Sequence, residues 1–116
     1  MEYGRWVREF PSTIIICDQN GTIIEMNEKA AKVYEKDGGF ALIGKNLFDC
    51  HPEPAKSKLK EIMEHRKSNS YTIEKNGIKK IIHQSPWYEN GNYKGFVEIS
   101  IEIPYEMPHF IRKPRN

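Results

Sequence analysis

The sequence has no long hydrophobic run, only two cysteines and little excess of charge of either sign. Its longest apolar stretch, TIIIC at residues 13–17, is far shorter than the roughly 20 apolar residues of a membrane-spanning helix. The amino-terminal MEYGRWVREF mixes charges with aromatic side chains and lacks the apolar core and small-residue cleavage site of a signal peptide. We therefore expect a cytoplasmic protein with no membrane insertion and with both cysteines reduced.

A low net charge and the absence of catalytic motifs argue against two further classes of protein. The formal net charge of +2 is too small to indicate a nucleic-acid partner. Arg112, Lys113 and Arg115 gather at the carboxyl end, where the pattern favours a solvated basic tail over a phosphate-binding arm. The sequence contains no glycine-rich phosphate loop, nucleophile elbow or metalloprotease helix motif. We expect no enzyme activity and no nucleic-acid binding.

The first part of the chain predicts a β-hairpin followed by a short helix, within the one domain that 116 residues allow. In residues 12–27, two β-branched runs surround Asn20-Gly21, a pair that tolerates the positive φ of a hairpin turn. Asn27 then stands as an N-cap before EKAAKVYEK, with Glu28 placed to oppose the helix dipole. The helix is expected to close at Gly38-Gly39.

A longer amphipathic helix is expected from Pro54 onward, with proline in its first turn. One face of this helix carries Ala55, Leu59, Ile62, Met63 and Arg66. Lysine and glutamate side chains occupy most of the other positions, which is the pattern of a helix with one buried face.

The last third of the sequence predicts three β-strands, with turns at Asn76-Gly77 and Asn90-Gly91. One face of the final strand carries only apolar side chains: Val97, Ile99, Ile101 and Ile103. The other face carries Glu98, Ser100 and Glu102. From this alternation we expect the apolar face to be buried and the polar face to contact solvent.

Three segments in this order resemble the PAS domain: IIICDQNGTIIEMNEKAAKVY (14–34), LIGKNLFD (42–49) and SPWYENGNYKGFVEISIEI (85–103). The resemblance covers residues 11–104 and implies an α+β fold, in which a five-stranded antiparallel sheet curves around a ligand cavity capped by helices. The ending IPYEMPHF is similar to that of short, stand-alone bacterial PAS proteins of the sensor type. Many relatives end in Asp-Ile-Thr and continue into an effector domain, whereas this chain reads Glu102-Ile103-Pro104. A separate signalling partner protein is therefore possible.

The resemblance divides the chain into an amino-terminal segment (1–10), the PAS domain (11–104) and an aromatic and basic tail (105–116). The amino-terminal segment places four apolar side chains at helical spacing: Tyr3, Trp6, Val7 and Phe10. PAS domains often carry an amphipathic helix here that pairs two subunits, so we expect a homodimer. A helix folded back on its own sheet would give the same pattern. A pure protein-interaction module without a ligand is thus an alternative function.

The main functional expectation is a sensor that binds a small, largely apolar ligand under the long helix and against the last three strands. The walls are expected from five apolar side chains: Leu59, Met63, Val97, Ile99 and Ile101. Gln84 or His83 would supply a polar contact. The same five apolar side chains could instead fill a closed core.

A haem-binding gas or redox sensor is the second expectation, and it depends on His51. In the oxygen-sensing haem branch, alignment on the prolines of HPEP places the iron ligand at Leu59, which cannot bind iron. Another haem-binding type carries its ligand where His51 stands, and a neutral imidazole there could bind the iron. The alternative is that His51 only precedes Pro52 and is held extended by it.

Other cofactors fit the sequence less well. The flavin branch carries a reactive cysteine directly after Gly-x-Asn, whereas Leu47 follows Asn46 here, so flavin photochemistry is not expected. Zinc is not expected because Cys50 and His51 are adjacent and point in diverging directions, and Cys17 is the only other thiol.

Overall fold

The computed structural model describes residues 4–115, and its first two strands form the predicted β-hairpin. β1 (Thr13–Asp18) pairs antiparallel with β2 (Ile23–Met26). The turn is closed by the Asp18 carboxylate, which accepts hydrogen bonds from the backbone N–H groups of Asn20 (2.9 Å) and Thr22 (3.0 Å). Gly21 supplies the positive φ that the turn requires.

The helices are short except for one. They are η1 (Arg5–Val7), α1 (Glu28–Val33), η2 (Glu35–Asp37), η3 (Gly39–Leu42), α2 (Leu47–Cys50) and α3 (Ala55–His65). Asn27 caps α1 as predicted, and the chain then tightens into 3-10 turns around Gly38, where φ is 120°. α3 is the predicted long helix and ends at Arg66 in the left-handed conformation.

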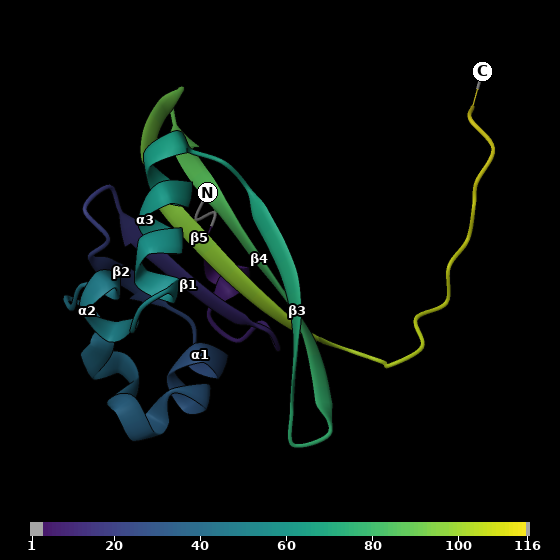
Figure 1. Ribbon diagram of the computed structural model, residues 1–116, viewed down its shortest axis with the longest axis horizontal. Helices are drawn as coiled ribbons and strands as arrows, with labels where there is room; N and C mark the ends of the chain where they lie inside the picture. Colours follow the sequence, from purple (N-terminus) through teal and green to yellow (C-terminus); the bar gives the residue numbers. More distant parts are fainter. Residues whose placement is uncertain (1–3, 116) are drawn as a thin grey trace.

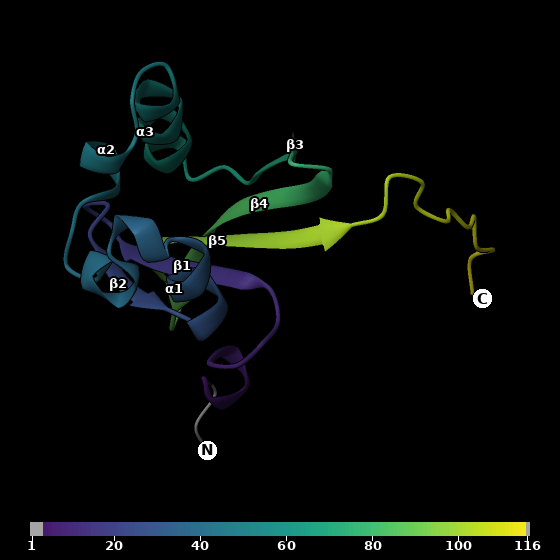
Figure 2. The same ribbon diagram turned by 90° about the horizontal axis from the view of Figure 1, so that it is seen from below.

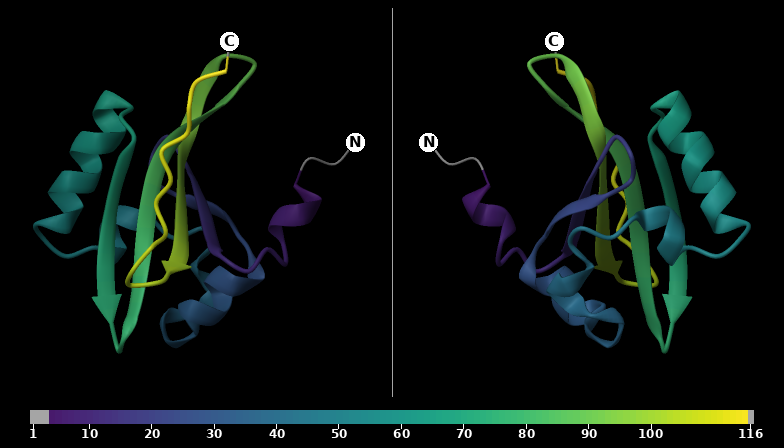
Figure 3. Two further views of the ribbon diagram at one scale, coloured as in Figure 1. Left: turned by 90° about the vertical axis from the view of Figure 1, so that its right-hand side faces the viewer. Right: turned by 90° about the vertical axis from the view of Figure 1, so that its left-hand side faces the viewer.

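Five antiparallel strands form one sheet in the order β2-β1-β5-β4-β3, which confirms the predicted fold class (Figure 1). The remaining strands are β3 (Asn69–Lys75), β4 (Ile78–Glu89) and β5 (Asn92–Ile103). α1, α2 and α3 gather on one side of the curved sheet (Figure 2). α3 and the amino-terminal η1 lie on opposite sides of the molecule (Figure 3). After Ile103 the chain has no helix or strand up to residue 115 and runs away from the sheet.

The side of β5 that faces the helices is the polar one, which is the reverse of what the sequence predicts. The face toward the helices, called the inner face, carries Ile15, Cys17, Ile82, Gln84, Phe96 and Glu98. The outer face carries Ile16, Ile81, Val97, Ile99 and Ile101. The expectation that the apolar side of β5 faces the helices is therefore wrong, and Ile101 is 41% exposed.

The core lies between the inner face and the helices, in two clusters. One cluster contains Ile15, Ile23, Met26, Ala30 and Leu42. The other contains Cys17, Leu59, Ile62, Met63 and Phe96. The apolar face predicted for α3 therefore packs on the sheet through Leu59, Ile62 and Met63. Within residues 4–115, no helix has the length and apolarity needed to cross a bilayer.

Candidate functional site

A cavity of about 360 Å³ lies between the inner face and the short helices. Its apolar walls come from the two-stranded hairpin, η3 and α2: Ile15, Ile23, Met26, Leu42 and Leu47. Its polar lining consists of Tyr34, Asp37, Lys45, Cys50, His51 and Glu98. A cavity of this size and composition is typical of a small-molecule site, in which a few polar groups orient a ligand against apolar walls.

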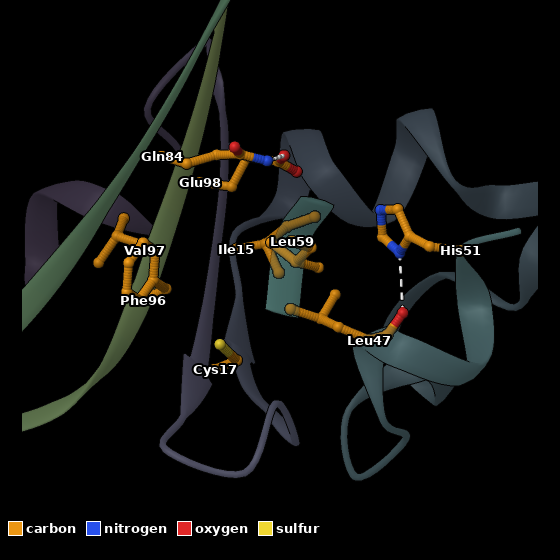
Figure 4. A pocket seen from close by; sticks show the side chains of 9 residues that line it. All are labelled: Ile15, Cys17, Leu47, His51, Leu59, Gln84, Phe96, Val97 and Glu98. Carbon is orange, nitrogen blue, oxygen red and sulfur yellow. Dashed lines mark hydrogen bonds between the residues drawn. The ribbon is translucent and has the colours of Figure 1, made fainter. Parts of the chain in front are cut away.

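Two further cavities adjoin this one. A narrow space of about 20 Å³ shares His51 and Glu98 with the main cavity and also touches Leu59 and Gln84 (Figure 4). Beyond it, a cavity of about 330 Å³ lies between α3 and the β3–β4 edge and is again lined by His51, Leu59 and Gln84. His51 therefore borders all three spaces, at the point where they meet.

His51 is positioned by the end of α2, where it forms the C-cap. Its Nδ1 lies 2.8 Å from the carbonyl oxygen of Leu47, and the side chain is half-buried. A carbonyl can only accept, so Nδ1 carries the proton and donates it. In the neutral ring, Nε2 is then an acceptor. The short helix α2 thus fixes both the orientation and the tautomer of this imidazole.

A chain of side-chain hydrogen bonds crosses the inner face from the edge strand to the central strand. Asn69 Nδ2 donates to Gln84 Oε1 over 3.1 Å, and Gln84 Nε2 donates to Glu98 Oε1 over 2.9 Å. The three residues are direct neighbours in the register of β3, β4 and β5. The donor from Asn69 fixes the orientation of the Gln84 amide, so Gln84 presents a donor to the Glu98 carboxylate. Glu98 is thereby held as an acceptor at the cavity wall.

Glu98 acts on two tyrosine side chains of this region. Burial is the main cause that raises the pKa of Tyr34, and the Glu98 carboxylate raises it further. The pKa of Tyr71 is raised for the same two reasons. Both phenols therefore keep their protons at neutral pH. Among the residues that the structure describes, Glu98 makes no salt bridge.

The predicted pocket residues divide into two groups. Leu59 and Gln84 line cavities, while Met63 packs in the core with Cys17 and Phe96. Val97 borders the narrow space, but its side chain points away from it (Figure 4). The placement of Ile99 and Ile101 in the ligand wall is wrong, because both belong to the outer face.

The histidines considered from the sequence lie in different surroundings. His51 lines the cavities, and its backbone is extended before Pro52, with φ of −113° and ψ of 122°. His83 is exposed and its Nδ1 lies 2.6 Å from Ser70 Oγ on the outer face, so it cannot be the polar contact of the pocket. His65 is exposed at the end of α3. Sequence reasoning missed Glu98, which it assigned to solvent.

A curved antiparallel sheet, helices over one face and a cavity between them define an α+β domain. The sequence profile of the PAS domain matches residues 11–103. The chain therefore belongs to the PAS domain family, whose members are typically sensory or signalling modules. No curated protein sequence matches this chain.

Solved structures with similar folds include PAS domains. The Aer2 receptor of Vibrio cholerae, described as a dual PAS-heme oxygen sensor, has a TM-score of 0.62 at 13% identity and covers 80% of this chain and 95% of its own. The PAS domain of an HTR-like protein from Haloarcula marismortui has a TM-score of 0.60 at 16% identity, with 84% and 86% covered. The PAS domain of histidine kinase ThkA has a TM-score of 0.59 at 23% identity, with 77% and 97% covered. These similarities establish the fold.

Proposed function

We propose that this PAS domain is a sensor module that binds a small ligand in the main cavity. The observation that supports the proposal is the cavity itself, of about 360 Å³, with apolar walls and with His51 and Glu98 among its lining residues. Ligand pockets in proteins typically have volumes of about 300–1,000 Å³ and this kind of lining. The ligand would contact Ile15 and Leu47, and its presence would be reported to a separate partner protein.

The test is to identify what copurifies with the protein from the cells that naturally make it. We expect denaturing mass spectrometry to detect one small molecule at close to one per chain. Ile15→Phe should lose this molecule, because the larger ring occupies the main cavity. Ile16→Phe is the matched control: it makes the same change one residue along β1, on the outer face, and should keep the molecule. A molecule retained equally by both variants would contradict the proposed site.

Haem is a second candidate, which the geometry of His51 supports. Its Nδ1 is bonded to the Leu47 carbonyl, an arrangement that typically orients a metal-binding histidine, and Nε2 is the remaining ligand atom. His51 would hold the iron, and Ile15 and Leu42 would offer apolar surface to the porphyrin. Bound haem would supply an iron that takes a gas molecule or changes redox state. In the same purification, haem would give a Soret band that is lost in His51→Ala and retained in His65→Ala.

We also infer that two copies of the chain associate through the amino-terminal segment. Trp6 is 62% exposed and its ring meets that of Phe10 edge-on, with centroids 5.4 Å apart. The segment is held in place because Arg8 bonds Glu28 over 3.0 Å and Phe10 O accepts from Asn27 Nδ2. η1 is a single 3-10 turn and not the expected amphipathic helix, Val7 is half-buried, and Tyr3 lies outside the described residues.

We expect the variant Trp6→Ala/Phe10→Ala to raise the dissociation constant of the dimer about tenfold or more, because burial of apolar surface contributes roughly 25 cal/mol per Å². Light scattering over a range of concentrations measures this change. Tyr105→Ala/Phe110→Ala removes two aromatic rings of the tail, which are 53% and 74% exposed, and should leave the dimer intact. A dimer unaffected by the Trp6 and Phe10 changes would rule out this interface.

Three further expectations stay predictions from the sequence: a cytoplasmic location, the absence of catalytic activity, and the absence of a nucleic-acid partner.

A further inference from the structure

We propose that the ligand of the main cavity is a small organic cation, in which a protonated amine or amidine group contacts Glu98 and an apolar body fills the cavity. This inference rests on the proposed sensor function and names the chemical class of its ligand. Three features of the described residues carry it: the hydrogen-bonding character of the cavity, its unbalanced charge and its apolar walls.

Two polar side chains that line both the main cavity and the narrow space, Glu98 and His51, present acceptors. Glu98 is held as an acceptor by the donor from Gln84 Nε2. In its neutral form, His51 presents Nε2 as an acceptor, because Nδ1 donates to Leu47 O. The two side chains come from opposite sides, Glu98 from β5 and His51 from the end of α2 (Figure 4). A ligand that satisfies both must therefore donate hydrogen bonds, as amines and amidines do.

The charge of the site points to a cation. A half-buried carboxylate is costly to remove from water unless an opposite charge accompanies it. Gln84, the residue that bonds Glu98, is neutral, and Glu98 has no salt bridge within residues 4–115. Lys45 and Asp37 also line the cavity, but both are exposed and carry opposite charges, so solvent screens them. The uncompensated charge next to the cavity is therefore the carboxylate of Glu98.

The remaining walls set the shape of the ligand. Ile15, Met26, Leu42 and Leu47 offer apolar surface and no fixed polar partner. A fully polar cation such as a short polyamine would leave this surface without contacts. The geometry therefore favours a cation with one charged end and an apolar or aromatic body.

Benzamidine, benzamide and benzoate test this inference on the full chain, because the three probes share a ring but carry positive, zero and negative charge. We expect benzamidine to shift the backbone amide resonances of Ile15 and Leu47, and to bind about tenfold or more tightly than benzamide. Glu98→Gln should remove this preference while keeping the shape of the side chain. Glu102→Gln is the matched control, since it removes the same charge from an exposed position on the same strand.

Each outcome decides the question. A benzamidine preference that disappears in Glu98→Gln and survives in Glu102→Gln supports the proposal. Tighter binding of benzoate, or a preference unchanged in Glu98→Gln, overturns the cation and leaves the cavity as a ligand site. If no probe shifts these resonances, the cation proposal is overturned, whereas the sensor function is judged separately by the copurified molecule. If Glu98→Gln does not fold, the affinities of the wild-type protein for benzamidine and benzoate decide whether the site prefers a cation.

Discussion

Replacing Asn27 with alanine is expected to lower the free energy of unfolding by about 3–5 kcal/mol. The Asn27 side chain is 2% exposed and makes four hydrogen bonds. Its Oδ1 accepts from Ile14 N (3.1 Å) and Ala30 N (3.0 Å), and its Nδ2 donates to Phe10 O (3.2 Å) and Ser12 O (2.7 Å). Alanine would remove the helix cap and leave these backbone groups without their partner. Chemical denaturation measures the loss.

Asn46→Ala is the matched control for this prediction. Asn46 also caps a helix, through a 2.9 Å bond from Phe48 N, and its Nδ2 donates to Asn20 O. The site is closer to solvent, so water can replace the lost partner and the expected cost is about 1 kcal/mol. Equal destabilisation by the two substitutions would show that the buried network around Asn27 adds nothing beyond its cap.

The second large effect is expected at Gly95, where β5 approaches β1. A Cβ atom at Gly95 would overlap the carbonyl oxygen of Cys17 and lie 2.8 Å from the carbonyl carbon of Asp18. These are backbone atoms of a paired strand, so the strands themselves would have to separate. The φ of 149° adds strain for any side chain. Gly95→Ala should therefore lower the free energy of unfolding by about 3 kcal/mol or more.

Gly91→Ala separates the steric effect from backbone strain. Gly91 also has a positive φ, of 80°, but a Cβ there would meet no atom within 4 Å. Its expected cost is the conformational strain alone, about 1 kcal/mol. Thermal or chemical unfolding of both variants measures the difference. If Gly95→Ala were as stable as Gly91→Ala, the close approach of β1 and β5 would not be a requirement of the fold.

Local chemistry explains why much of the fold could be predicted from the sequence. The hairpin turn before Ile23, the cap at Asn27 and the start of α3 each depend on residues within a few positions of one another. The helix after Asn27 was predicted too long because its last residues form a 3-10 turn before Gly38. Helix propensity cannot distinguish an α-helical turn from a 3-10 turn at the end of a helix.

The candidate site could be predicted only in part, because it depends on which face of β5 meets the helices. Alternation separates the two faces of a strand but is symmetrical between them. Hydrophobicity favoured the face of Ile99, yet the inner face carries Glu98, which lines the main cavity. His51 was identified through the family resemblance. Its hydrogen bond to Leu47 depends on the turn of α2, which no periodic pattern indicated.

The position of β5 between β1 and β4 makes the assembly of this sheet a late event. Thr13 pairs with Ser100 across 87 residues of chain, whereas every other strand pairing is local. Closing so long a loop is slow, because the chain loses conformational entropy before the stabilising contacts between the strands have formed. Ile15 and Glu98 become neighbours only through this pairing. On the ribosome, β1 can therefore pair with β5 only after all the intervening strands and helices have been synthesised, and the main cavity forms only with that pairing.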